Sequence, residues 1–324
     1  MHSISRRAFV LSAATTAAVF GLDGPMEFVG SAFAQAPDPN LVQKGFTKFK
    51  VGDIEVTQIY DGIWNKPHDP GFIKNATVED TKAALKAGGL PDDVVPITFT
   101  VTVVTVGGKQ VLFDAGTGIP GQVQPTAGLL ASKNLAAAGI DVAKLDTILV
   151  THFHPDHVFG LMEKDGTGQK FPNAKIFVPA PEFAFWTGES VPEGAKGLSG
   201  RIKATIGSWS NIEKIEGEKE VVPGVRSLAT PGHTPGHTSY QLASGNQQLI
   251  VLGDLTNLPA LNMKNPGWHL AFDANAALAE SNRRKTFDRV VADKITVTGY
   301  HFGMPGAGTI EKDGNGYAFV PVKA

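Results

Sequence analysis

Thr151-His152-Phe153-His154-Pro155-Asp156-His157 follows directly on the apolar run Leu145–Val150 and gathers three imidazoles and a carboxylate within six residues. Side chains alternate along an extended segment, so His152 and His154 are expected to point the same way, and the Pro-Asp turn brings His157 back toward them. Imidazole nitrogens and carboxylate oxygens suit a borderline cation such as zinc. A polar loop with solvent-facing histidines is the alternative, but only nine of the 324 residues are histidine, so chance clustering is rare. The stretch therefore predicts a metal site after a buried strand.

Later segments repeat this pattern of an apolar run that ends on a metal-ligating residue type. His233 and His237 lie in the turn-rich segment 230–238, while Asp254 and His301 each end an apolar run. Alone, a Gly-Asp pair is usually a turn, and a histidine after a strand is often a core residue. In α/β architectures, however, strand-end loops carry the chemistry, so these segments together predict additional ligands for the same site.

The order and type of these motifs resemble the metallo-β-lactamase superfamily from about Ile54 to the C-terminus. The resemblance implies an α/β fold, a four-layered αββα sandwich whose strand-end loops hold two metal ions. It implies that the first ion is held by His152, His154 and His233, the second by Asp156, His157 and His301, and both by a bridging Asp254. It also implies that these ligands are oriented by residues that do not bind metal, a common arrangement around metal sites, namely Asp114, Thr151 and His237. For Asp114, a plain turn aspartate is the alternative.

The absence of cysteine narrows the branch of the family. The chain contains no cysteine, so it cannot supply the Cys ligand of the largest zinc β-lactamase subclass, and the other lactam-cleaving branch generally lacks a bridging carboxylate such as Asp254. The ligand set resembles glyoxalase II, quorum-signal lactonases, ribonuclease Z and methyl parathion hydrolase, and the tail from residue 301 resembles the methyl parathion hydrolase and aryl-lactonase branch. The chain departs from the family at Phe159, where many members have glycine. That change bears on the pocket and removes no ligand.

The resemblance implies hydrolysis of neutral lactones or aryl esters by a hydroxide shared between two divalent ions, with Zn²⁺ expected and Mn²⁺, Co²⁺ or Fe²⁺ as alternatives. The expected catalytic carboxylates are Asp254, as the bridge, and Asp156, as a proton donor to the leaving alkoxide. Phosphotriester hydrolysis of the methyl parathion type is the alternative. β-Lactamase-like activity, thioester hydrolysis, an iron sulfur dioxygenase and a non-catalytic metal-binding protein are less favoured, because all seven ligand positions are filled and few cationic residues flank the motifs.

Aromatic residues near the ligand motifs are expected to wall a pocket for a small uncharged organic substrate, since such pockets are mostly apolar. The expected wall consists of Phe159, Phe183, Phe185, Trp186 and Phe302, to which Trp64, Phe72 and Ile73 could add. Large apolar residues are preferentially buried, so each of them is also interpretable as core.

The N-terminus resembles a twin-arginine export signal. Arg6 and Arg7 precede an alanine-rich apolar stretch that ends near Phe20 and is too short to span a bilayer as a mature helix. Small residues allow cleavage after Ala34 or Ala36. Residues 1–36 are therefore expected to be a signal peptide and residues 37–324 a single hydrolase domain, periplasmic or secreted. An uncleaved N-terminal anchor is the alternative.

The net charge and the apolar content limit the classes of partner that the chain can bind. The net charge is −2, and residues 1–36 carry equal numbers of acidic and basic side chains, so their loss leaves it unchanged. A chain with this charge has no excess of basic residues to bind a nucleic acid backbone. An apolar content of 42% is enough for one large core. A homodimer is a further possibility.

Local patterns predict strands and helices in alternation, which favours an α/β protein. Strands are expected over Ile54–Asp61, Thr98–Val106, Lys109–Phe113, Leu145–Val150, Ile176–Val178, Val225–Ala229, Ser239–Leu242, Leu249–Asp254 and Ile295–His301. The pair Gly107-Gly108 is expected to close a hairpin. Helices are expected over Val78–Ala87, Gly128–Ala138, Pro181–Trp186 and Asp273–Ala292, the last with a solvated face at Arg283, Arg284 and Lys285.

Overall fold

Two seven-stranded sheets form the centre of the computed structural model, which describes residues 37–163 and 168–323. The predicted signal peptide and its cleavage sites lie outside the described residues. The first sheet has the strand order β1-β2-β3-β4-β5-β6-β7 and consists of β1 (Phe46–Val51), β2 (Ile54–Pro67), β3 (Val94–Val106), β4 (Lys109–Phe113), β5 (Thr147–Leu149), β6 (Lys175–Pro179) and β7 (Ile212–Ile215). The second has the order β14-β13-β12-β11-β10-β9-β8 and consists of β8 (Glu220–Val222), β9 (Val225–Ala229), β10 (Thr238–Ser244), β11 (Gln247–Val251), β12 (Thr296–Thr298), β13 (Ala307–Asp313) and β14 (Gly316–Pro321).

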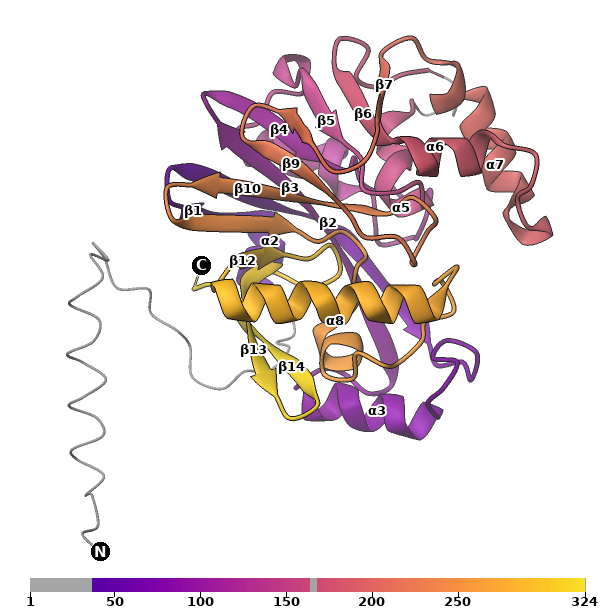
Figure 1. Ribbon diagram of the computed structural model, residues 1–324, viewed down its shortest axis with the longest axis vertical. Coiled ribbons are helices and arrows are strands. Elements are labelled where there is room, and N and C mark those ends of the chain that lie inside the picture. The colour runs from indigo at the N-terminus through magenta and orange to yellow at the C-terminus, as the bar shows by residue number, and fades with distance from the viewer. Residues whose placement is uncertain (1–36, 164–167, 324) are drawn as a thin grey trace, which may run out of the picture.

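Helices flank the two sheets. The α-helices are α2 (Pro39–Lys44), α3 (Val78–Ala87), α4 (Leu135–Ala137), α5 (Pro155–Val158), α6 (Ala180–Thr187), α7 (Lys196–Ala204) and α8 (Ala276–Asp293). Single turns of 3-10 or π-helix cover Leu130–Asn134, Val142–Lys144, Phe159–Leu161, Glu193–Ala195, Ile206–Ser208 and Pro259–Met263. In Figure 1, α8 runs across the molecule beside the second sheet, while α6 and α7 lie on the side of β6 and β7.

Apolar residues on both faces of the central strands produce three core layers. In β5, Ile148 packs in a core shared with Trp186 of α6, whereas the next residue, Leu149, packs in a core that contains residues of both sheets. On the far side, Ile250 of β11 packs in a third core with Phe287 of α8. Adjacent strand residues point to opposite faces, so this alternation produces a helix–sheet–sheet–helix sandwich. The predicted α/β fold of four layers is confirmed.

One contact ties the two sheets together directly beside the ligand stretch. Tyr240 of β10 packs its ring 5.5 Å from that of Phe113 in β4 and donates a hydrogen bond of 2.7 Å to the carbonyl of Val150. Because Val150 immediately precedes Thr151, the second sheet is fixed against the segment that delivers the histidines.

Most predicted elements are present, with two informative differences. Helix α3 has the predicted bounds, and its start is fixed by reciprocal hydrogen bonds between Thr77 and Asp80. The predicted helix Gly128–Ala138 is instead a π-turn followed by the three residues of α4. The predicted solvated face of α8 is wrong for Arg283, which is 1% exposed. The carbonyls of loop residues far from it in sequence bind its guanidinium, which removes the cost of burying the charge.

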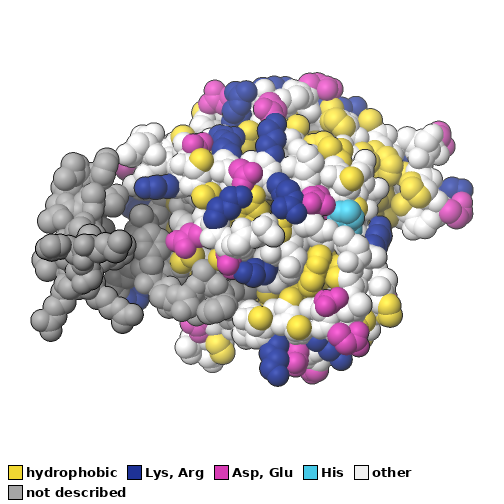
Figure 2. Space-filling model, turned by 60° about the horizontal axis from the view of Figure 1, so that its bottom comes forward, with side chains coloured by type: hydrophobic (Ala, Val, Ile, Leu, Met, Phe, Trp, Pro, Cys, Tyr) yellow, Lys and Arg dark blue, Asp and Glu magenta, His cyan; other side chains and the backbone are white. Residues whose placement is uncertain are grey.

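The surface carries charges of both signs. On the face shown in Figure 2, lysine and arginine side chains are interspersed with aspartate and glutamate. Across the described ranges, no helix combines the length and apolar character that a membrane span requires.

Candidate metal centre

Loops at one edge of the sandwich bring all the predicted ligands together. His152 and His154 follow β5, and Asp156 and His157 lie in the short helix α5. The remaining three come from the second sheet: His233 lies between β9 and β10, Asp254 follows β11, and His301 follows β12. Residues separated by up to 149 positions thus meet where strands of two sheets end.

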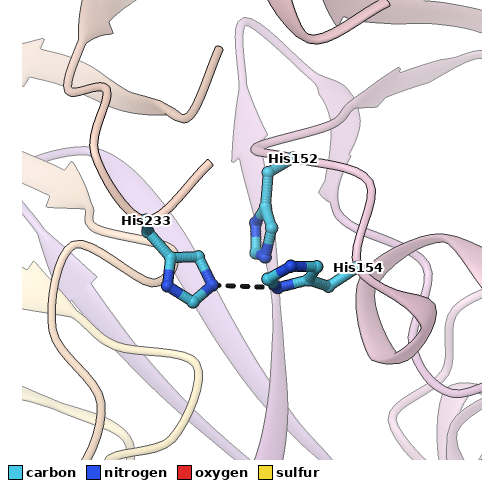
Figure 3. A group of neighbouring side chains, drawn as sticks. All are labelled: His152, His154 and His233. Carbon is cyan, nitrogen blue, oxygen red and sulfur yellow. Dashed lines mark hydrogen bonds between the residues drawn. The ribbon is translucent and has the colours of Figure 1, made fainter. Parts of the chain in front are cut away.

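The first group consists of three histidines, His152, His154 and His233, each of which places a nitrogen within 4.8 Å of the others. Figure 3 shows the three rings converging on one point, with a dashed line between His233 Nε2 and His154 Nδ1, which are 2.9 Å apart. His152 is fully buried, and its Nε2 atom has no hydrogen-bond partner among the described residues. The three nitrogens therefore face a common space.

The second group consists of Asp156, His157 and His301, again with ligand atoms within 4.8 Å of one another. Asp254 lies between the two groups. Its Oδ1 atom is 3.2 Å from His157 Nε2, and its Oδ2 atom is 3.0 Å from His301 Nε2 and 3.4 Å from His233 Nε2. One carboxylate therefore faces ligands of both groups.

The donor atoms fit divalent metal ions. Three of them, His152 Nε2, His157 Nε2 and Asp254 Oδ1, are buried without a hydrogen-bond partner among the described residues. Each buried unpaired polar atom costs roughly 1–3 kcal/mol, so three that face one space indicate a missing common partner. Imidazole and carboxylate donors in this arrangement suit cations such as zinc.

Asp114 fixes the orientation of two neighbouring groups. Its carboxylate accepts hydrogen bonds from His157 Nδ1 at 2.7 Å and from the backbone N–H and hydroxyl of Thr151, both at 2.8 Å. The Thr151 hydroxyl in turn lies 3.0 Å from Nδ1 of His152. Because the Nδ1 atoms of both histidines are engaged this way, their Nε2 atoms face the common space. The φ angle of Asp114 is +59°, an uncommon value for a residue other than glycine.

His237 supports Asp254 and has no nitrogen free to bind a metal. Its Nδ1 atom donates to the carbonyl of Thr230 at 3.1 Å, and its Nε2 atom accepts the backbone N–H of Asp254 at 3.0 Å. Gly253 makes this approach possible: its φ is +58°, and a Cβ atom there would lie 2.9 Å from His237 Nε2. The Gly-Asp pair is thus required by both backbone conformation and space.

Burial and neighbouring charges divide the histidines into two classes. Burial lowers the pKa of His152 and His154 well below the ordinary value, and it lowers that of His237 to about 3. Burial also lowers the pKa of His157, but the carboxylates of Asp254, Asp114 and Asp156 outweigh this effect and raise it well above the ordinary value. Burial raises the pKa of Asp254, but His301 and His157 hold it well below its ordinary range. The second group thus has the more negative surroundings, which favour a bound cation.

Three buried acidic residues that the sequence did not single out accept hydrogen bonds from distant segments, and two of them, Asp273 and Glu182, reach the segments of the candidate ligands. Asp273, predicted to be the first residue of a helix, lies in the loop before α8 and accepts from His233 Nδ1 at 2.9 Å. Asp61, buried at an irregularity in β2, accepts hydrogen bonds from the backbone N–H groups of Thr117 and Leu130, and burial raises its pKa to about 6. Glu182 of α6 accepts from the backbone of Phe153. Their partners are distant in sequence, so no local spacing pattern could have indicated them.

A cavity of about 200 Å³ opens on both groups of ligands. Its described lining combines the ligand residues His154, Asp156, His233, Asp254 and His301 with Trp64, Ile97, Phe99, Val123, Gln124, Pro155, Asn257 and Phe272. Asn257 is 3% exposed, and its Oδ1 atom accepts no hydrogen bond from the described residues. The wall is therefore mainly apolar, and it includes one amide oxygen without a partner among the described residues.

Most residues of the predicted aromatic wall are not part of the lining of this cavity. The ring of Phe159 lies under the guanidinium of Arg201 at 4.0 Å, and that of Phe183 lies near the Lys214 amine at 4.2 Å. Tertiary contacts place the others in the core or away from the cavity: Phe185, Trp186, Phe302, Phe72 and Ile73. Only Trp64 of the predicted set lines the cavity.

Comparisons with known proteins agree on one family. Residues 100–295 match the model of the metallo-beta-lactamase superfamily. An N-acyl homoserine lactonase of Bacillus sp is 31% identical over 172 residues, which are 52% of this chain and 62% of that protein. The chain thus spans about three-fifths of the length of this relative.

Two solved structures cover more of the chain. A dizinc quorum-quenching lactonase, AidC, solved in complex with a product, has a TM-score of 0.79 and 26% identity and covers 86% of this chain and 98% of its own. The hydrolase AbOPH of the beta lactamase superfamily has a TM-score of 0.77 and 25% identity, with the same coverage.

Proposed function

Because the chain belongs to the metallo-beta-lactamase superfamily, we propose that it is a dinuclear metal-dependent hydrolase of neutral lactones or aryl esters. The observation that carries the proposal is the placement of Asp254 between two groups of three ligands, at the floor of an apolar cavity. The similarity to a dizinc lactonase over most of the chain supports it. On this proposal, His152, His154 and His233 hold the first ion, Asp156, His157 and His301 the second, and Asp254 both.

Two zinc ions bound in this way would activate a water molecule and polarise the substrate carbonyl. The chain's own residues do the rest. The backbone N–H of Asp254 donates to the Nε2 atom of His237, and this contact holds the Asp254 carboxylate between the two groups of ligands. Asp156, whose side chain is 17% exposed and lines the cavity, would take a proton from the attacking water and pass it to a departing alkoxide. A phenolate, which is a better leaving group, needs no such proton.

The cavity wall supports an uncharged substrate. Trp64, Phe99 and Phe272 provide flat apolar surfaces, and the described lining includes neither lysine nor arginine to bind an anionic thioester or nucleotide. Asn257 offers one amide to a polar group of the substrate. Lactones and aryl esters match this combination of an apolar body with a single polar centre.

A substrate panel combined with metal analysis tests the proposal. The panel contains an N-acyl homoserine lactone, dihydrocoumarin, an aryl acetate, methyl paraoxon and a β-lactam, and kcat/KM is measured for each on one preparation of known metal content. We expect a lactone or the aryl acetate to have the highest kcat/KM. Preference for methyl paraoxon by a hundredfold or more would contradict the proposal and favour phosphotriester hydrolysis by the same site.

We also infer that the protein is exported to the periplasm or beyond through its N-terminal twin arginines. Arg6 and Arg7 precede a short apolar stretch, and small residues at Ala34 and Ala36 allow cleavage. Replacing both arginines by lysine should retain the full-length protein in the cytoplasm, as measured by cell fractionation. Unchanged export of this double variant would exclude the twin-arginine route.

A further inference from the structure

Glu182 connects the two loops that carry the first group of histidines. Its side chain is fully buried in α6. The Oε1 atom accepts hydrogen bonds from the backbone N–H of Phe153 at 2.9 Å and from the indole N–H of Trp186 at 2.7 Å, and the Oε2 atom accepts the backbone N–H of Gly236 at 2.9 Å. Phe153 lies between His152 and His154, and Gly236 lies in the loop of His233. One carboxylate thus spans both loops.

The packing around Glu182 leaves little freedom. A Cβ atom on Gly236 would lie 2.0 Å from the backbone nitrogen of Glu182, so the loop and the helix are in direct backbone contact. One helical turn later, the ring of Trp186 packs edge-on against that of His154, with centroids 6.3 Å apart. Helix α6 therefore contacts both loops of the first group through backbone, carboxylate and ring.

We propose that Glu182 is a positioning residue that sets the distance between the loop of His152 and His154 and the loop of His233, and thereby the affinity for the first metal ion. The inference rests on the proposed dinuclear function. The two loops start from different sheets, β5 in the first and β9 in the second, so no strand pairing fixes their separation. The N–H groups of Phe153, Trp186 and Gly236 all donate to Glu182, an arrangement that requires both of its side-chain oxygens to be acceptors.

Replacing Glu182 should weaken the binding of the first ion only, because other residues orient the histidines of the second group. His157 is oriented by the carboxylate of Asp114 at 2.7 Å, and Nδ1 of His301 by the backbone carbonyl of Thr98 at 2.7 Å. Neither contact passes through α6. Releasing Glu182 from one loop therefore leaves these two histidines in place.

Glu182→Gln tests the proposal, because the amide oxygen can replace only one carboxylate oxygen and the NH₂ group then faces a backbone N–H. One loop is released, and the first ion should be held about 10–100-fold more weakly, the usual cost of losing an outer partner of a metal ligand. The zinc content after dialysis against graded chelator shows whether the two ions are lost at different chelator concentrations. Glu189→Gln is the matched control, since the Glu189 side chain is 93% exposed and, among the described residues, forms an ion pair with Lys203 alone.

A second variant covers the case in which Glu182→Gln fails to fold. Glu182→Asp keeps the charge but shortens the side chain by one methylene group, so it cannot reach both loops, and the same selective loss of one ion is expected. Parental affinity for both ions in either variant, or equal weakening of both, would overturn the proposal. A parent chain that binds no divalent ion would instead contradict the proposed function, which separates the two failures.

Discussion

Removal of the Asp114 carboxylate should destabilise the fold even when no metal is present. The Thr151 hydroxyl can turn to His152 Nδ1, 3.0 Å away, but the change leaves the two other buried donors without an acceptor, the backbone N–H of Thr151 and Nδ1–H of His157. At roughly 1–3 kcal/mol for each unpaired donor, the free energy of unfolding should fall by about 2–6 kcal/mol. Asp114→Gly is the informative substitution, because glycine accepts the φ of +59° and the loss then reports hydrogen bonds and not backbone strain. Asp114→Ala should lose about 1–2 kcal/mol more for that strain.

Urea denaturation of chelator-treated protein measures this loss without the contribution of bound metal. Asp114→Asn, which retains one acceptor oxygen, should lie between the parent and the glycine variant. The same variants should hold the second ion about 10–100-fold more weakly, because His157 is no longer oriented. An unfolding free energy of Asp114→Gly within about 0.5 kcal/mol of the parent would refute the assigned role of this carboxylate.

Three further predictions concern pH, metal and the cavity. The folded-state pKa of His237, about 3, lies below its unfolded value of 6.5, so the stabilisation by neutral His237 is complete above pH 6.5 and is lost as the pH falls toward 3. At about 1.4 kcal/mol for each pKa unit, the difference in unfolding free energy between the chelated parent and His237→Gln should shrink by about 2 kcal/mol between about pH 7 and about pH 5. A difference that stays constant over this range would contradict the burial of His237. Chelation should abolish hydrolysis, and added zinc, cobalt or manganese should restore it, whereas full activity after verified metal removal would exclude the mechanism. Trp64→Ala and Phe272→Ala should raise KM for an aryl lactone because they line the cavity, while Phe159→Ala should not; the reverse order in a kinetic assay would place the substrate elsewhere.

The clustering of the candidate ligands could be predicted because it depends largely on short-range spacing along the chain. His152, His154 and His157 stand within six residues, after a strand whose apolar side chains are buried on both faces. Asp254 and His301 end apolar runs in the same manner. In such cases residue type and position are enough to predict which side chains meet, because the ends of neighbouring strands lie at one edge of the sheets.

The features that the sequence did not predict depend on contacts between distant segments. Three consecutive cationic residues in α8 indicate a solvated face, yet Arg283 is buried because the carbonyls of Leu255 and Pro266 bind its guanidinium. The direction of an aromatic ring is equally non-local. Phe159 lies two residues after His157 but turns toward Arg201, whereas Phe272 forms part of the cavity wall although it lies 18 residues after Asp254.

The zinc content of Asp254→Ala, measured beside that of the parent, tests the dinuclear site, because the Asp254 carboxylate lies within 3.4 Å of histidines from both groups. Metal analysis by mass spectrometry and lactone hydrolysis are measured on the same preparations. We expect two ions for each parent chain, one or none in the variant, and a loss of hydrolysis by several orders of magnitude. Two tightly held ions with near-parental turnover in Asp254→Ala would contradict the proposed dinuclear site.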